Sequence, residues 1–161
     1  MQQCLVTQQK YSIKTILNRA ISLENKNNIS IEDMYIGMEV SSSRIITEND
    51  INDFAKISGD NNPIHIDEEY AKNTRYKKRI AHGLMSASFF SALFGTKLPG
   101  KGCVYTYQSL RFKRPIYIDD EVKTIIKIKS IDKKKNKILF TTQCIIKSKI
   151  AIDGEAEIYI P

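Results

Sequence analysis

The second half of the chain alternates apolar and polar residues in the manner of β-strands. Four stretches are rich in β-branched and aromatic residues: CVYTYQSLRF (103–112), IYIDDEVKTIIKIKSI (116–131), KILFTTQCIIKS (137–148) and AIDGEAEIYI (151–160). Turn residues or charged segments separate these stretches, so the pattern predicts four strands. Arg114-Pro115 predicts a bend or a sheet edge, because proline cannot donate to the hydrogen-bond ladder.

The first half begins with one strand and one short helix. YIGMEVSSSRII (35–46) has a glycine turn followed by a run typical of a strand. TENDINDFAKIS (47–58) predicts a helix with Thr47 as N-cap, Asp50 in a capping-box position and Gly59 at its end. The apolar side of this helix should comprise Ile51, Phe54, Ala55 and Ile57.

Two further helices follow. Asp67 is a suitable N-cap for the short helix EEYAKN (68–73). AHGLMSASFFSALFG (81–95) is apolar nearly all the way round, which predicts a helix enclosed by the rest of the domain and closed by Gly95. Helices early and strands late predict an α+β domain, in which an antiparallel sheet wraps around one long buried helix.

The chain of 161 residues predicts one domain, here residues 31–161, behind an N-terminal extension over residues 1–30. The polar stretch ENKNNIS (24–30) is typical of a linker. Residues 1–23 contain no acid and no long apolar run, so a secretory signal is not expected. The sequence predicts a cytoplasmic protein; the alternative is a mitochondrion or another organelle, if residues 1–23 are a targeting peptide.

Net charge and cysteine usage limit the possible partners. The net charge of +7 suggests nucleic-acid binding, but much of the excess lies in KKKNK (133–137), which is typical of a solvated hairpin tip. No stretch approaches the roughly 18 apolar residues of a membrane span. The three cysteines, Cys4, Cys103 and Cys144, form no CxxC pair, which argues against a cysteine zinc site. We therefore expect neither a nucleic-acid nor a membrane partner, and no metal.

Candidate chemistry is concentrated in SGDNNPIH (58–65), which holds one of the two histidines of the chain. The glycine, the asparagines and Pro63 predict a sharp loop rather than a helix or strand. Such a loop can direct Asp60 and His65 to a common point, where a carboxylate and an imidazole could activate a water molecule. The alternative is structural: Asp60 caps a turn and His65 packs against it.

The second histidine precedes Gly83 at the start of the apolar helix. Backbone N–H groups there have no partner in the helix, and glycine allows a substrate oxygen to approach them. The arrangement predicts an oxyanion site for a carbonyl or thioester. Alternatively, Gly83 serves only the geometry of the turn before the helix. For His82 we favour a structural role, as a buried ring held by a hydrogen bond.

Three segments together resemble the MaoC-like hydratases, in particular the (R)-specific enoyl-CoA hydratase group: SGDNNPIHIDEEYA, RIAHGLMSASFFSALFGTKLPGKG and YQSLRFKRPIYIDDEV. The resemblance covers nearly all of the chain from Met34 onward. It implies a hot-dog fold, a homodimer whose sheets join, and reversible syn hydration of trans-2-enoyl-CoA to (R)-3-hydroxyacyl-CoA. It implies no metal or redox cofactor; coenzyme A or a carrier-protein pantetheine arm is part of the substrate.

The resemblance also implies roles for individual residues. Asp60 and His65 would be the catalytic pair, with Asp60 as base and His65 as acid. Gly83, Asn62 and Ser91 would form the oxyanion and substrate-binding group. From their charge alone, four further residues could meet the phosphates of coenzyme A or of a carrier-protein pantetheine arm: Lys101, Arg111, Lys113 and Arg114. The alternative for each of them is a solvated surface side chain. The segment YKKRIAHG is more basic than is usual in the family, which could alter what binds at the rim.

Other functions stay open on the same fold. One is a thioester-binding or regulatory protein without hydratase activity, and another is a thioesterase. A pure binding protein needs neither Asp60 nor His65, which argues against it. The sequence leaves open the acyl chain length, the choice between coenzyme A and a carrier protein, and the direction of the reaction.

Overall fold

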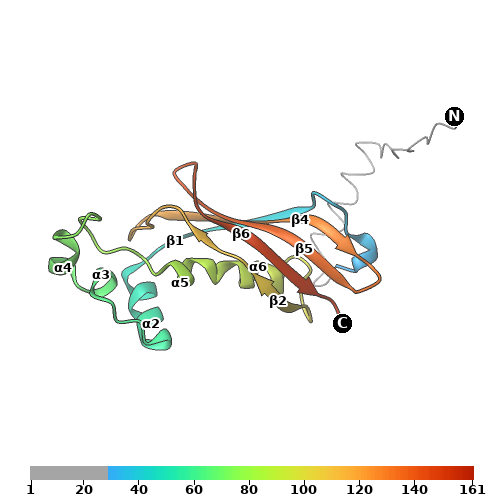
Figure 1. Ribbon diagram of the computed structural model, residues 1–161, viewed down its shortest axis with the longest axis horizontal. Coiled ribbons are helices and arrows are strands. Elements are labelled where there is room, and N and C mark those ends of the chain that lie inside the picture. Colours follow the sequence, from blue (N-terminus) through green and yellow to red (C-terminus); the bar gives the residue numbers. More distant parts are fainter. Residues whose placement is uncertain (1–28) are drawn as a thin grey trace, which may run out of the picture.

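A computed structural model of the protein describes residues 29–161, which form an antiparallel sheet around a helical segment (Figure 1). The strands follow the order β1-β4-β5-β6-β2, and β3 also pairs with β6. Their bounds are β1 Glu39–Ile45, β2 Val104–Gln108, β3 Arg111–Phe112, β4 Glu121–Asp132, β5 Lys137–Ile146 and β6 Lys149–Tyr159. The expected α+β hot-dog architecture is therefore confirmed. The predictions for residues 1–28 lie outside the described residues.

The alternation of buried and exposed side chains explains how the long strands β4 and β5 pack against the core. In β5 every second side chain is buried, and β4 shows the same period over its first eight residues. Period-two burial places one face of the sheet against the core and leaves the other outside. β4 begins at Glu121, later than expected, because residues 116–120 form a connection in which the Asp120 carboxylate accepts the Tyr117 N–H at 2.9 Å.

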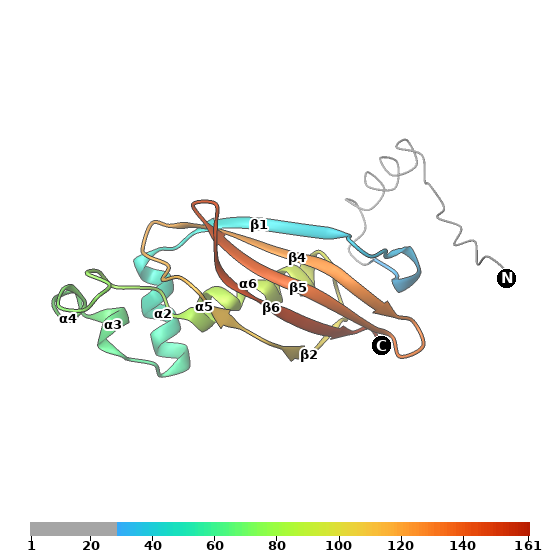
Figure 2. The ribbon, with the colours of Figure 1, turned by 45° about the horizontal axis from the view of Figure 1, so that its top comes forward.

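The sheet wraps around two consecutive helices, α5 (Gly83–Ala87) and α6 (Phe89–Thr96), as Figure 2 shows. Ser88 joins them in helical geometry, and its N–H donates to the carbonyls of Leu84 and Met85. One side packs against the sheet through Met85, Ser86, Ala87, Phe90, Leu93 and Phe94. The other side is exposed at Leu84, Ser88, Ser91, Ala92 and Gly95. The expectation of a fully enclosed helix is wrong for this side, because no element of the described residues covers it.

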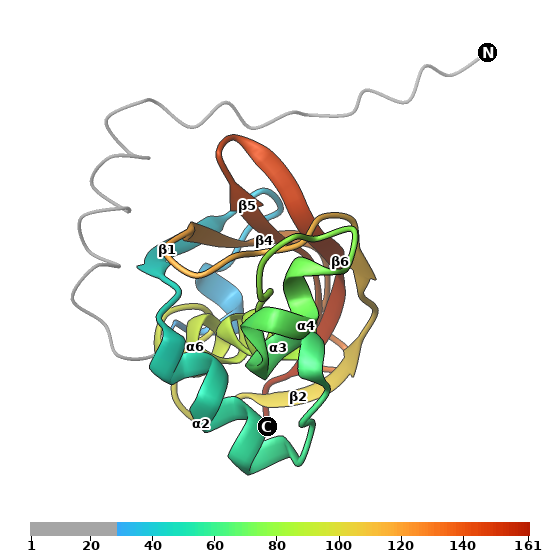
Figure 3. The same ribbon diagram turned by 90° about the vertical axis from the view of Figure 1, so that its left-hand side faces the viewer.

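Three short helices lie beyond one end of the sheet (Figures 1 and 3). They are α2 (Glu48–Ser58), α3 (Pro63–Ile66) and α4 (Glu68–Lys72). We call this region, residues 48–72, the overhang.

The overhang helices begin and end where their caps predict. Thr47 and Asp50 form the expected capping box of α2, and Gly59 ends that helix with a φ of 76°. Asp67 caps α4 as expected. Ile57, expected on the apolar side of α2, is 84% exposed, because the buried side is defined by Ile51 and Ala55, one turn apart.

Helix α3 was not expected, since residues 58–65 were predicted to form a loop. Asn62 has a non-helical conformation, as a residue before proline should, but its side chain caps the Ile64 N–H at 3.2 Å. Pro63 then occupies the first helical position, where its missing N–H costs nothing. A single helical turn therefore carries His65.

Packing at the N-terminal side begins before the predicted domain boundary. Ile29 is buried in the core, and its N–H donates to the Pro99 carbonyl at 3.0 Å. A 3-10 turn, η1 (Ile31–Asp33), follows with Ser30 as its cap. Within residues 29–161, no helix has the length and apolar character that crossing a bilayer requires.

Candidate active site

The loop between α2 and α3 is held by a chain of local hydrogen bonds. The Asp60 N–H donates to Ser58 Oγ at 3.2 Å, and the Asn62 N–H donates to Asp60 Oδ1 at 3.2 Å. Asn62 in turn caps Ile64, as described above. Short polar side chains favour such turns because they compete for nearby backbone groups. One oxygen of Asp60 thus fixes the loop, and the other, Oδ2, is free to face the pocket.

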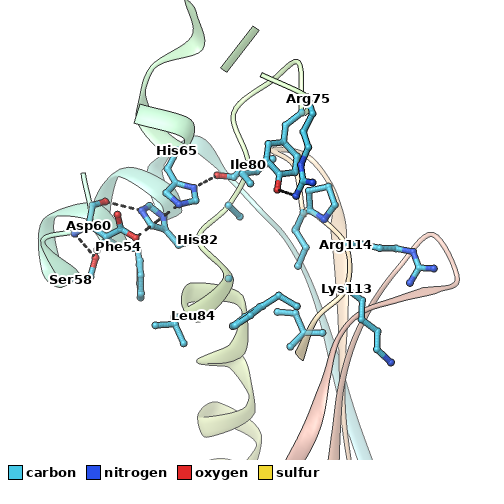
Figure 4. A pocket seen from close by; sticks show the side chains of 17 residues that line it. Phe54, Ser58, Asp60, His65, Arg75, Ile80, His82, Leu84, Lys113 and Arg114 are labelled. Carbon is cyan, nitrogen blue, oxygen red and sulfur yellow. Dashed lines mark hydrogen bonds and ion pairs between the residues drawn. The ribbon is translucent and has the colours of Figure 1, made fainter. Parts of the chain in front are cut away.

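His65 lies opposite this second oxygen (Figure 4), with its Nε2 4.0 Å from Asp60 Oδ2. Its Nδ1 is 2.8 Å from the Ile80 carbonyl, which only accepts, so Nδ1 carries the proton. In the uncharged ring Nε2 is then a free acceptor. The 4.0 Å separation is too long for a direct hydrogen bond, but it suits two groups that contact the same water molecule.

His82 completes the cluster from the start of α5. Its side chain is buried (2% exposed), and its Nε2 lies 3.0 Å from the backbone oxygen of Asp60. Its ring stacks on that of His65, with 3.9 Å between the centroids and 30° between the planes. The ring of Phe54 in α2 packs against it at a tilt of 52°, with 5.0 Å between the centroids. His82 is therefore a hydrogen-bonded buried ring, as favoured from the sequence.

Burial lowers the pKa of His65, and the neighbouring His82 ring lowers it further. The Ile80 carbonyl and the Asp60 carboxylate act in the opposite direction. The side chain of His65 is 12% exposed, whereas that of Asp60 is 51% exposed. The site thus pairs a solvated carboxylate with a sheltered imidazole that loses its proton more readily than in water.

Gly83 borders the same pocket, which has a volume of about 510 Å³. As the first residue of α5, it has an N–H without a partner inside the helix, at the positive end of the helix dipole. A Cβ at this position would lie 2.6 Å from Cε1 of Phe112. Gly83 therefore permits close packing of Phe112 at the border of the pocket.

The structure brings together only part of the predicted substrate-binding set. Asp60, His65, Gly83, Lys113 and Arg114 all line the pocket. Figure 4 places Lys113 and Arg114 on the opposite side from the two histidines. Lys113 also pairs with Asp153 at 2.5 Å, and Arg114 donates to the Ile150 carbonyl.

The remaining predicted residues lie elsewhere. Ser91 is exposed on α6, two turns beyond Gly83, and does not line this pocket. Arg111 borders a separate hollow beside β6, and Lys101 is exposed in the turn before β2. Asn62 acts on the loop through its cap rather than on the pocket itself.

Several pocket residues were not identified from the sequence as members of the site. Arg75 and Tyr76 border the opening, and the Arg75 guanidinium donates to the Tyr76 hydroxyl at 2.6 Å. In the sequence, only the basic character of the segment before His82 pointed to a role for this part of the chain. Ile80 contributes through a backbone carbonyl, which leaves no signature in the sequence.

Asp60, His65 and His82 also form the one group in residues 29–161 that brings three possible metal-ligand atoms within 4.8 Å of one another. The two imidazole rings stack, with 3.9 Å between their centroids and 30° between their planes. Nδ1 of His65 and Nε2 of His82 are already engaged with carbonyl oxygens. The arrangement suits proton transfer better than coordination of a cation.

The described cysteines do not contribute a nucleophile. Cys144 is buried in the sheet, and burial raises the pKa of its thiol to about 12. Burial also raises the pKa of Cys103. A protonated thiol is a poor nucleophile, so nothing in their surroundings suggests covalent chemistry.

Comparisons with known proteins identify relatives of the chain in sequence and in fold. The family model of the MaoC-like domain matches residues 33–150. The chain is 43% identical over 130 residues to an (R)-specific enoyl-CoA hydratase of Rhodospirillum rubrum, covering 81% of this chain and 90% of the relative. It is 33% identical over 130 residues to a mitochondrial 3-hydroxyacyl-[acyl-carrier-protein] dehydratase of Arabidopsis thaliana. This match covers 78% of this chain and 77% of the relative. The solved (R)-hydratase of Aeromonas caviae superposes with a TM-score of 0.77 at 34% identity, over 80% of this chain and 98% of that one.

Proposed function

Because the chain belongs to the family of MaoC-like domains, we propose that it catalyses the reversible syn hydration of a trans-2-enoyl thioester to the (R)-3-hydroxyacyl thioester. The observation that carries the proposal is the meeting of Asp60, His65 and the Gly83 amide at one pocket. The volume of this pocket, about 510 Å³, lies within the range of small-molecule sites.

Each group has a role in the proposed reaction. The thioester oxygen accepts from the Gly83 N–H, which draws electrons from C3 and stabilises the enolate-like transition state. Donors of this kind typically contribute about 3–4 kcal/mol. Asp60 Oδ2 and His65 Nε2 hold one water molecule, whose hydroxyl adds to C3. One proton of that water passes through the pair to C2 on the same face, so no proton is gained or lost overall.

The tautomer of His65 bears on which group takes the proton first. Its Nδ1–H donates to Ile80, and its lowered pKa favours the uncharged ring, so Nε2 is ready to accept. We therefore assign His65 as the first proton acceptor in hydration, with Asp60 orienting the water and stabilising the imidazolium. This assignment reverses the split expected from the sequence, in which Asp60 is the base. By microscopic reversibility, the group that accepts a proton in hydration donates it in dehydration.

The thioester carrier is coenzyme A or the pantetheine arm of a carrier protein. Arg75, Lys113 and Arg114 surround the opening with positive charge and would meet the phosphate groups that both carriers possess. Rates measured with enoyl-CoA substrates of increasing chain length, beside the matching enoyl-carrier-protein, distinguish the two carriers and establish the acyl preference.

The experiment that tests the function is direct. The purified protein, mixed with crotonyl-CoA, should remove the absorbance of the conjugated thioester without releasing free thiol. Release of thiol from an acyl-CoA would identify a thioesterase instead. Tight binding of the thioester with neither change would identify a binding or regulatory protein.

We also propose a homodimer, in which a second copy pairs with the open edge of the sheet. The edge strand β2 and the neighbouring β3 expose four large apolar side chains, namely those of Val104, Tyr105, Tyr107 and Phe112. Leu84, which is 62% exposed, also borders the pocket. Light scattering on the eluted protein should give twice the chain mass of 18.4 kDa.

We propose that the enzyme acts in the cytoplasm. The alternative destination is a mitochondrion or another organelle, with residues 1–23 as the targeting peptide. A fluorescent protein fused behind residues 1–30 distinguishes the two: it stays diffuse in the first case and enters an organelle in the second.

A further inference from the structure

His82 contacts both Asp60 and His65 and directly precedes Gly83, yet the proposed reaction does not use it. Its side chain is almost fully buried, and Nε2 lies 3.0 Å from the carbonyl oxygen of Asp60. Since that oxygen only accepts, Nε2 carries the proton. His82 is also the residue directly before Gly83, so it links the Asp60 loop to the amide that faces the thioester.

We propose that His82 is a positioning residue: its Nε2–H fixes the backbone of Asp60 to the start of α5, and its ring covers His65 so that His65 enters the reaction uncharged. The inference deepens the proposed function and rests on it for the catalytic roles of Asp60 and His65. The contacts that support it belong to the protein itself and can be tested without a substrate.

The hydrogen bond explains how an exposed loop keeps a defined position. Asp60 has few neighbours, and its side chain is half exposed. The contact with His82 joins residues 22 positions apart and comes from a side chain that α2 holds in place through Phe54. Without it, only the local turns at Ser58 and Asn62 would hold Asp60 Oδ2 near His65.

The stacked rings explain why the imidazole of His65 favours its uncharged form. A ring 3.9 Å away removes water from one face of His65, and two charged rings at that distance would repel each other. Nδ1 of His82 is buried and has no hydrogen-bond partner within residues 29–161.

Other charged or titratable groups around His65 are few. Asp60 faces it from the loop, and Arg75 and Tyr76 border the same pocket from the segment before His82. Lys113 and Arg114 lie across the pocket. Of these, the Asp60 carboxylate raises the pKa of His65 and the His82 ring lowers it.

Two substitutions separate the two contributions of His82. His82→Gln keeps an amide donor near the position of Nε2 but removes the ring. His82→Phe keeps a ring against His65 but removes the donor. Because the chain has two histidines, either variant leaves His65 as the single imidazole, whose NMR titration needs no assignment.

The proposal predicts opposite results for the two variants. In His82→Gln, the midpoint of the His65 titration should rise by roughly half a pH unit or more, while kcat stays within about tenfold of wild type. In His82→Phe, the midpoint should stay near that of wild type, while kcat falls by roughly 10- to 100-fold with a smaller change in KM. Lys134→Gln, at the distant hairpin tip, is the control for both.

Two outcomes would overturn the proposal. One is a His65 titration that is the same in wild type and His82→Gln. The other is a parallel loss of kcat and melting temperature in both variants with no change in the titration, which is the sign of a purely structural residue. If His82→Phe does not fold, the titration of His65 in the His82→Gln variant alone supports or refutes the proposal. Absence of hydratase activity in the wild type would refute the proposed function but would leave the titration result intact.

Discussion

The overhang and the sheet are stabilised in different ways. In the sheet, β5 buries alternate side chains along its whole length, and β4 and β6 pair with it over nearly all of theirs. In the overhang, α2, α3 and α4 together bury only Ile51, Ala55 and Ala71. Caps and turns define it instead, from Thr47 to Asp67.

This difference separates stability from function. A fully buried large apolar side chain contributes about 1.5–3 kcal/mol, whereas a helix cap contributes about 1 kcal/mol. The proposed catalytic pair lies in the overhang, which buries few apolar side chains and leaves the Asp60 side chain half exposed. Substitutions in the overhang should therefore change the rate, and substitutions in the sheet should change the free energy of unfolding.

The largest effect is expected for the catalytic pair. Asp60→Asn and His65→Gln should each lower the rate of crotonyl-CoA hydration by roughly 10²- to 10⁴-fold, because each removes a group that contacts the reacting water. The melting temperature should change little, since both side chains lie in the overhang. Asp53→Asn on α2, an exposed acid that pairs with Lys56, is the matched control and should keep the wild-type rate. Wild-type rates in both site variants would mean that the site is elsewhere.

The sheet should show the opposite behaviour. Phe140 is fully buried in β5, and its ring packs edge-on against Phe94 of α6 at 4.9 Å. Phe140→Ala should lower the free energy of unfolding by about 3–5 kcal/mol, while the folded fraction keeps its kcat. Ile57→Ala, at an exposed apolar position of the overhang, should leave the unfolding midpoint in urea unchanged. Equal stability losses in these two variants would contradict the division between the regions.

A pair of caps inside the overhang sharpens the comparison. Asn62 caps α3, which carries His65, and Asp67 caps α4, which carries no predicted site residue. Alanine at either position should cost about 1 kcal/mol of stability. Only Asn62→Ala should also lower kcat, by roughly tenfold, because it loosens the turn that holds His65. Similar rates in the two variants would show that the cap of α3 has no part in the reaction.

The smallest effect concerns pH. The pKa of His65 is lowered in the folded protein, so below its ordinary value of about 6.5 the unfolded chain binds the proton more readily. The contribution of His65 to stability is therefore complete above that pH and is lost as the pH falls toward the folded pKa. The melting temperature of the wild type should fall faster than that of His65→Gln between about pH 6.5 and 5. Parallel curves would contradict the assigned shift.

The parts predicted from the sequence are those determined by neighbours along the chain. The capping box of α2, the glycine that ends it and the periods of β4, β5 and β6 are all local patterns. The approach of Asp60 to His65 was also predictable, because only four residues separate them and these include the turn-forming Asn61, Asn62 and Pro63.

The parts that were missed depend on contacts between distant segments. His82 stacks on His65 only because the segment before α5 is fixed by the Ala81 N–H to the Ile116 carbonyl and by a bridge between Ile80 and Tyr117. The exposed side of α5 and α6 escaped prediction because apolar composition alone does not show which side of a helix is buried. Helix α3 was not predicted because proline is common both in loops and at the first position of a helix, so Pro63 does not distinguish the two.

Stereochemistry tests the central claim most directly. Wild-type protein and crotonyl-CoA in D₂O should give (R)-3-hydroxybutyryl-CoA with one deuterium at C2, on the same face as the new hydroxyl, as read by NMR of the product. Asp60→Asn should give almost none of it in the same time. A product of (S) configuration, deuterium on the opposite face, or no product from the folded wild-type protein would contradict the account.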